Sequence, residues 1–202
     1  MTDQRPPSLS ESLRPRVAGL IQPVAQLCLR LNISADLLTV GGLVLMAVVG
    51  ALLAAGHFIA GGALVLLSAP LDALDGTVAR LSGVKSKFGA FLDSTSDRYA
   101  EGFILIGLSI YGLSIRNDWI VVLAFAAFWG SLLVSYARAR AEGLGVDCKI
   151  GLFTRLERFI LIIVMLFTGW ILPGLALMTL LAHFTVLQRL LYVRRALRLP
   201  EV

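Results

Sequence analysis

The chain has 202 residues, of which 57% are hydrophobic and only 15% are charged. About a quarter of the residues in soluble domains are charged, so this composition excludes an ordinary soluble globular protein and indicates a membrane protein. The formal net charge of +5 is interpreted as membrane topology and contact with anionic lipids, and not as nucleic-acid binding.

An amphipathic helix is predicted over Glu11–Leu31, before the first membrane span. Its apolar residues recur at three- and four-residue intervals and include Leu20, Val24, Leu27 and Leu31. Basic residues occupy polar positions of the same segment, so the helix suits the cytosolic headgroup boundary. A helix that only packs against the membrane bundle has the same pattern, and the sequence leaves both alternatives open. Residues 1–35 are assigned to this amino-terminal arm, and residues 36–202 to one membrane domain.

The membrane domain is predicted to be all-α, with six transmembrane helices. In chain order the spans are Leu37–Gly56, Phe58–Leu71 and Gly102–Ile115 with extensions, Trp119–Ala137, and two within Phe159–Gln188. The first has enough uncharged residues to cross a hydrocarbon core of about 30 Å. The second and third are too short unless their helices extend into the acidic stretch between them, which places carboxylates at membrane depth. Glycines and Pro173 interrupt the last apolar run and divide it into two spans.

The positive charges predict the orientation of these spans. Lys and Arg are enriched in cytosolic loops close to span ends. Basic residues cluster before the first span, between spans two and three, between spans four and five, and after span six, whereas only Arg116 falls on the opposite side. We therefore expect a multi-pass protein of the cytoplasmic membrane with both termini in the cytosol.

Four aspartates lie at the predicted junction between spans two and three. Asp72 and Asp75 are three residues apart near the end of span two, and Asp93 and Asp97 are four apart at the start of span three. Each pair therefore shares one face of a helix. A tight connection at Gly83 returns the chain beside itself, so we expect the two pairs to face each other.

Four facing carboxylates cannot all stay ionised near a bilayer without compensating positive charge, which divalent cations would supply. Oxygen ligands without nearby Cys or His favour Mg²⁺ or Mn²⁺ over zinc. Gly76, Ala79 and Gly89 leave room beside the acids for a ligand or a close helix neighbour. Arg80 lies within reach of a phosphate held by such ions, and would neutralise charge that the ions leave over.

This stretch resembles the CDP-alcohol phosphotransferases, because it matches their signature D-x2-D-G-x2-A-R-x8-G-x3-D-x3-D at every fixed position from Asp72 to Asp97. The resemblance implies that Asp72, Asp75, Asp93 and Asp97 hold two metal ions that bridge the pyrophosphate of a CDP-lipid such as CDP-diacylglycerol. It further implies that Asp97 takes the proton from the attacking hydroxyl as CMP is released, and that the enzyme is a homodimer. The residues implied in binding the CDP moiety are Asp36, Leu37, Leu38, Thr39, Gly76, Arg80 and Ser86.

Two other interpretations of the acids remain. They could form ion pairs without chemistry, with Arg80, Arg98 or Lys87 as partners, or they could mark the path of a cation transporter or channel. A cation path needs no arginine beside its carboxylates, whereas a phosphate site does. Arg80, with Gly76 and Ala79, therefore favours the enzyme.

Arginines near the cytosolic ends of spans four to six predict a phosphorylated acceptor, because the guanidinium fork matches phosphate oxygens. The pattern resembles the phosphatidylinositol phosphate synthase branch of the family, in which positions matching Arg138, Arg155 and Arg189 hold the phosphate of inositol phosphate. That branch usually has lysine where Arg138 stands and proline where Leu156 stands. The expected reaction is transfer of a phosphatidyl group from CDP-diacylglycerol to inositol phosphate.

Glycerol 3-phosphate, which gives phosphatidylglycerophosphate, is the alternative acceptor. A cytosolic rim of positive charge with no role in the reaction would account for Arg140 and Arg158, but less readily for Arg189 beside polar Gln188.

Overall fold

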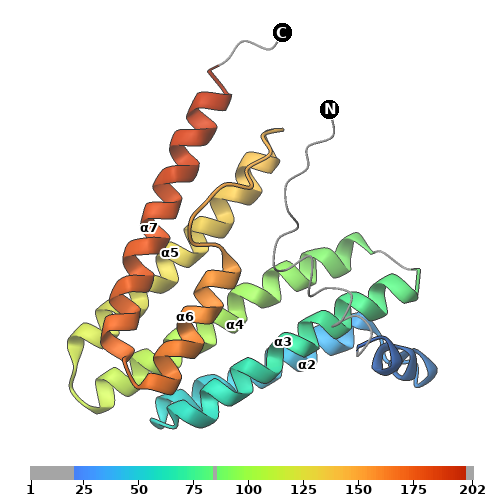
Figure 1. Ribbon diagram of the computed structural model, residues 1–202, viewed down its shortest axis with the longest axis horizontal. Helices are drawn as coiled ribbons and strands as arrows, with labels where there is room; N and C mark the ends of the chain where they lie inside the picture. The colour runs from blue at the N-terminus through green and yellow to red at the C-terminus, as the bar shows by residue number, and fades with distance from the viewer. Residues whose placement is uncertain (1–20, 84–85, 199–202) are drawn as a thin grey trace. The chain divides into compact units, whose positions relative to one another are not determined.

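The computed structural model describes residues 21–83 and 86–198, and within these ranges all regular secondary structure is helical (Figure 1). Residues 21–30 are helical. Six helices follow: α2 (Ala35–Ala54), α3 (Phe58–Leu81), α4 (Lys87–Ser114), α5 (Asp118–Glu142), α6 (Arg155–Thr168) and α7 (Ile171–Ala196). The all-α prediction is confirmed for the described ranges. The part of the predicted amphipathic helix that precedes residue 21 lies outside them.

Four of the described helices, α2, α3, α5 and α7, are long and apolar enough to cross a membrane, which agrees with a membrane protein. Helix α4 is long, with 28 residues, but its first 15 residues carry Lys87, Asp93, Asp97, Arg98 and Glu101. Helix α6 has 14 residues and is therefore about 21 Å long, which is shorter than a hydrocarbon core of about 30 Å. Membrane-spanning character is thus found for four helices, and the count of six spans stays a prediction.

The helix ends follow local sequence signals. Helix α6 stops at Thr168 because Gly169 takes a left-handed conformation with φ 74°. Helix α7 begins at Ile171, as the glycines of this segment predict. Helix α3 ends at Leu81, followed by a turn in which Gly83 has φ +70°. The predicted breaks in the apolar runs are therefore confirmed.

The chain divides into two compact units, which are described separately. Among the described residues, the first contains 21–44 and most of Leu67–Asp97, and therefore the four aspartates. The second contains Leu45–Leu66 and the chain from Arg98 onward, and therefore the predicted acceptor arginines.

In the first unit, the helix at residues 21–30 packs against α3. Ala25 and Cys28 are buried in one apolar cluster with Leu74 and Val78. On the same helix Leu27 is 54% exposed, so its apolar surface is wider than the face that packs. Of the two alternatives for this segment, packing on the bundle is found for its described part, and apolar area remains for contact with lipid.

In the second unit, α5 and α7 lie side by side (Figure 1). A Cβ atom on Gly130 of α5 would lie 2.7 Å from Nδ1 of His183 on α7, so the glycine permits the close approach. The hydroxyl of Thr179 on α7 donates to the carbonyl of Leu123 on α5 at 3.2 Å. Small residues and a hydroxyl therefore join the two helices, as is common between membrane helices.

Helices α2 and α4 approach most closely at a pair of glycines in the same unit. A Cβ atom on Gly107 would lie 2.3 Å from the carbonyl oxygen of Gly50, and a Cβ on Gly50 would lie 2.6 Å from that of Phe103. Neither position has space for a side chain. The backbone contact therefore depends on glycine at both positions.

Candidate active site

The first unit brings together residues from the start of α2, the end of α3 and the start of α4. Asp72 and Asp75 lie on α3, and Asp93 and Asp97 lie on α4, as the apolar runs and acid spacing predict. Asp75 is only 8% exposed, whereas Asp72 and Asp93 are exposed and Asp97 is half-buried. The negative charges of Asp72 and Asp93 both act on the Asp75 carboxylate, so Asp75 lies close enough to each of them to feel its charge.

Thr39 connects α2 to the buried acid of α3. Its hydroxyl donates to Oδ2 of Asp75 at 2.8 Å and lies 3.1 Å from the carbonyl of Ala35. The hydrogen bond fixes one oxygen of Asp75 and stabilises its charged form, because a hydroxyl donor favours a carboxylate. Thr39 is predicted to bind the CDP-lipid donor, and the structure gives it a direct contact with Asp75, a predicted metal ligand.

Asp36, in the first turn of α2, faces the first turn of α4. A Cβ atom on Gly89 would lie 3.2 Å from Oδ1 of Asp36 and 3.1 Å from Oγ of Ser86. The Ser86 hydroxyl accepts a hydrogen bond of 2.6 Å from the Gly89 amide. Three residues from the predicted site, Asp36, Ser86 and Gly89, therefore lie together, and a side chain at Gly89 would crowd both neighbours.

The remaining predicted donor-binding residues lie on the same elements. Arg80 is exposed and folds back along α3, where its Nη2 donates to the Thr77 hydroxyl at 2.8 Å. Its Nη1 would lie 3.4 Å from a Cβ atom on Gly76, so Gly76 leaves room for the guanidinium itself. Leu37 is 59% exposed, and Leu38 packs against the apolar cluster around Cys28.

The donor atoms of the acids fit a hard divalent cation. They are carboxylate oxygens, one of them ordered by a hydroxyl, and such oxygens are the ligands of Mg²⁺ and Mn²⁺. Among residues 21–83 and 86–198, no group of three or more His, Cys, Asp or Glu side chains stands in an arrangement that could hold an ion. The four-aspartate metal site therefore stays a prediction, which the chemistry and proximity of Asp72, Asp75 and Asp93 support.

In the second unit, Arg189 of α7 is 4% exposed. Its Nε donates to the carbonyl of Ile150 at 2.9 Å, and its Nη1 donates to the carbonyl of Val134. Gly151, with φ +140°, lies over the same guanidinium, because a Cβ there would be 3.4 Å from Nε and from Nη2. Arg189 thus binds one carbonyl of α5 and one of the loop between α5 and α6, and only part of its guanidinium is left for a ligand.

The loop is held on α7 by further side chains. The Thr185 hydroxyl accepts from the amide of Phe153 at 3.1 Å, and Oε1 of Gln188 accepts from the amide of Leu152 at 3.1 Å. These contacts explain why a polar residue, Gln188, stands beside Arg189: its side chain binds the loop, a partner that the sequence does not reveal.

The other two predicted acceptor arginines are exposed. Arg138 of α5 donates from Nε to Oε1 of Glu142 at 2.8 Å, within its own helix. Arg155 is the first residue of α6. The positive charges of Arg138 and Arg158 both act on Arg189, so three guanidinium groups share this part of the unit. Guanidinium groups suit an anion, and two of these three already have a carboxylate partner, Glu142 for Arg138 and Glu101 for Arg158.

Arg158 corrects the sequence interpretation. A rim of cytosolic charge would leave it exposed, yet Arg158 is 4% exposed. Its Nε donates to Oε1 of Glu101 on α4 at 2.7 Å, and its Nη2 lies 3.3 Å from Oε2. Arg140, by contrast, is exposed, in agreement with that interpretation. No local sequence pattern indicates a role for Glu101, because its partner is 57 residues away. Glu101 nevertheless follows Asp97 by one helical turn.

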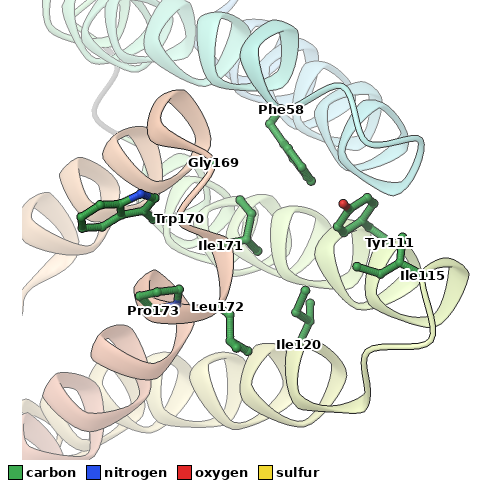
Figure 2. A pocket seen from close by; sticks show the side chains of 9 residues that line it. All are labelled: Phe58, Tyr111, Ile115, Ile120, Gly169, Trp170, Ile171, Leu172 and Pro173. Atoms are coloured by element: carbon green, nitrogen blue, oxygen red, sulfur yellow. The ribbon is translucent and has the colours of Figure 1, made fainter.

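A cavity of about 430 Å³ lies in the second unit, at the turns that join α4 to α5 and α6 to α7. Figure 2 shows its apolar lining, in which the Phe58 and Tyr111 rings meet edge to face with centroids 4.7 Å apart. None of the predicted site residues lines it. The cavity is therefore separate from the candidate active site.

The helices that are long and apolar enough to cross a membrane define a helical membrane protein, and the aspartates of its first unit are candidates for a metal-dependent phosphoryl-transfer site. The sequence pattern of the family described as CDP-alcohol phosphatidyltransferase matches residues 32–188. The match extends over most of the chain, so the chain belongs to this family and is a transferase. This confirms the predicted family and enzyme class, and decides against a transporter or channel.

Relatives of the chain confirm the predicted branch. An archaetidylinositol phosphate synthase of Methanothermobacter thermautotrophicus is 35% identical, with 95% of this chain and 100% of that protein covered. A phosphatidylinositol phosphate synthase of Cutibacterium acnes is 34% identical, with 92% of this chain and 98% of that protein covered.

Solved structures of a relative agree with this branch of the family. The phosphatidylinositol phosphate synthase of Mycobacterium tuberculosis with CDP-DAG bound has a TM-score of 0.82 and 28% identity to this chain. The alignment covers 87% of this chain and 94% of that one. The same relative in complex with manganese and citrate has a TM-score of 0.80, with 86% and 88% covered. The manganese of that relative supports the use of divalent metal ions in the family.

Proposed function

We propose that this protein is a phosphatidylinositol phosphate synthase, which transfers a phosphatidyl group from CDP-diacylglycerol to inositol phosphate and releases CMP. The observation that carries the proposal is similarity to synthases of this type over more than nine tenths of the chain. The arginines of the second unit agree with it, because a phosphorylated acceptor needs guanidinium groups that other alcohols do not.

The donor half of the site is assigned to the first unit. Asp72, Asp75, Asp93 and Asp97 would hold two Mg²⁺ ions, with Mn²⁺ as a substitute. Bound there, such ions neutralise the charge of the pyrophosphate and of the departing CMP. Donor contacts are assigned to Asp36, Leu37, Leu38, Thr39, Gly76, Arg80 and Ser86. Thr39 holds an oxygen of Asp75 at 2.8 Å and thereby orders a ligand, and Arg80 adds positive charge beside the pyrophosphate.

In the reaction, the hydroxyl oxygen of the acceptor bonds to the phosphorus that carries the diacylglycerol, and the bond from that phosphorus to CMP breaks. Asp97 accepts the hydroxyl proton as general base. Arg138, Arg155 and Arg189 bind the acceptor phosphate. Arg138 and Arg155 are exposed and can reach a soluble ligand, whereas Arg189 contributes from a buried position.

The assembly is proposed on the same basis. Six spans with an amino-terminal amphipathic helix, both termini in the cytosol, and a homodimer are expected. The cytosolic placement follows from the distribution of Lys and Arg, and it gives the active site access to soluble inositol phosphate.

One assay tests the proposal. Purified protein receives CDP-diacylglycerol, Mg²⁺ and one acceptor from a panel of inositol phosphate, glycerol 3-phosphate, inositol and serine. CMP release and the mass of the lipid product are measured. Inositol phosphate is expected to give product, and inositol and serine are not. Product with glycerol 3-phosphate alone would replace the proposed acceptor, and CMP release with no acceptor preference would contradict the arginine assignment.

A further inference from the structure

Glu101 and Arg158 form an ion pair inside the second unit. The pair is bidentate, with 2.7 Å between Nε and Oε1 and 3.3 Å between Nη2 and Oε2. The side chains are only 5% and 15% exposed for Arg158 and Glu101. Taking two charges out of water is costly, and ionisable residues on membrane helices are rare where they have no function. The pair therefore calls for an explanation beyond helix packing.

The neighbours of Arg158 point to the acceptor arginines. Arg155 lies one helical turn before it on α6. The positive charge of Arg158 also acts on Arg189. The Arg158 guanidinium is occupied by Glu101, so Arg158 does not offer these donors to an acceptor phosphate. Arg158 is therefore placed to support the arginines that are assigned to the acceptor phosphate.

The Arg158 side chain ties the first turn of α6 to Glu101 on α4. The capping box of this turn, in which the Thr154 amide and hydroxyl both donate to Glu157, orders the turn internally. The Glu101–Arg158 pair supplies the contact with a second helix. The fork geometry limits sliding and rotation of that turn, because two parallel hydrogen bonds set both distance and direction.

We propose that Glu101 and Arg158 are positioning residues for acceptor binding: their ion pair holds the first turn of α6 against α4, so that Arg155 is presented to the acceptor phosphate. The inference rests on the proposed function, since it assumes a phosphorylated acceptor. Neither residue is assigned a contact with the substrates. Loss of the pair therefore impairs recognition of the acceptor, and leaves binding of CDP-diacylglycerol unchanged.

The test uses Glu101→Gln and Arg158→Lys, which keep side-chain length or charge but lose the bidentate pair. Steady-state kinetics are measured with each substrate varied in turn, together with thermal unfolding. The acceptor KM is expected to rise about tenfold or more, as for loss of a charged hydrogen bond. The donor KM stays within about twofold, because only the acceptor side is disturbed.

A matched control removes an ion pair that is exposed. Lys149 and Asp147 pair at 2.7 Å with side chains 74% and 66% exposed, and Asp147→Asn is expected to change neither KM. The double variant Glu101→Gln/Arg158→Gln leaves no uncompensated charge, so it covers the case in which a single variant fails to fold. Its acceptor KM is expected to rise by no more than the larger single effect, because both changes break the same contact.

The outcomes separate this inference from the proposed function. Wild-type enzyme that uses no phosphorylated acceptor would overturn both. Wild-type enzyme that uses one, with an unchanged acceptor KM in the folded variants, would overturn the positioning role alone. Equal increases in both KM values would also overturn it, because a general loss of structure acts on both substrates.

Discussion

The hydroxyl of Thr39 donates a hydrogen bond of 2.8 Å to Oδ2 of Asp75 across 36 residues of sequence. It links the first turns of α2 to the most buried of the four signature aspartates. The contact makes Thr39 a support for a predicted metal ligand, in addition to its predicted place beside the CDP moiety.

Thr39→Val should therefore weaken metal use while keeping the shape of the side chain. We expect activity at limiting Mg²⁺ to fall about 10- to 100-fold, as for loss of an outer-shell partner, with partial recovery at high Mg²⁺. The measurement is CMP release as a function of Mg²⁺ concentration. Thr168→Val is the control. It removes a hydroxyl that donates to the carbonyl of Val164 at 2.7 Å and accepts from the amide of Trp170 at 3.4 Å, and it should leave the dependence of activity on Mg²⁺ concentration unchanged.

Asp93→Asn and Asp97→Asn should each leave the protein folded but reduce CMP release about 100-fold or more, since each removes a proposed ligand charge and the second removes the base as well. Thermal unfolding of the purified variants checks the fold. Full activity in either folded variant would contradict the assignment of the acids.

Removal of divalent ions should abolish activity. Dialysis against a chelator is expected to stop CMP release, and added Mg²⁺ or Mn²⁺ should restore it, because the candidate ligands are all carboxylate oxygens. Activity that persists after exhaustive chelation, with metal content checked by elemental analysis, would show that the aspartates have another role.

Arg155→Ala should raise the acceptor KM about tenfold or more, as expected for loss of a charged hydrogen bond to phosphate, with little change in the donor KM. Kinetics with varied inositol phosphate measure the effect. Arg195→Ala, at the last turn of α7, removes a charge that is not assigned to the site and should leave both KM values alone.

Gly107→Ala should destabilise the membrane bundle. Its new Cβ would lie 2.3 Å from the Gly50 carbonyl oxygen, and relief of such a clash by backbone movement costs about 1–3 kcal/mol. Thermal unfolding in detergent should show a lower midpoint. The new Cβ atom of Gly41→Ala would meet no atom within 4 Å. This variant should unfold at the wild-type temperature or above, because alanine favours the helix.

Local patterns were sufficient for much of the structure. Helix breaks at Gly83 and Gly169 were predictable because glycine adopts the left-handed backbone that ends a helix. The apolar runs located the helices, and the acid spacing identified the donor motif, because both depend on neighbours within two turns of the same helix. The number of spans was less predictable, since α4 combines apolar length with charge and α6 is short.

The sequence by itself determined the family and predicted the acids of the donor site, because eight motif residues stand at fixed short distances along two helices. Only the tertiary structure decided which distant polar groups meet: Thr39 with Asp75, Arg189 with the carbonyl of Ile150, and Glu101 with Arg158. The physical reason is that these contacts join residues 36 to 57 positions apart. Their formation depends on how the helices pack, which no local periodicity specifies.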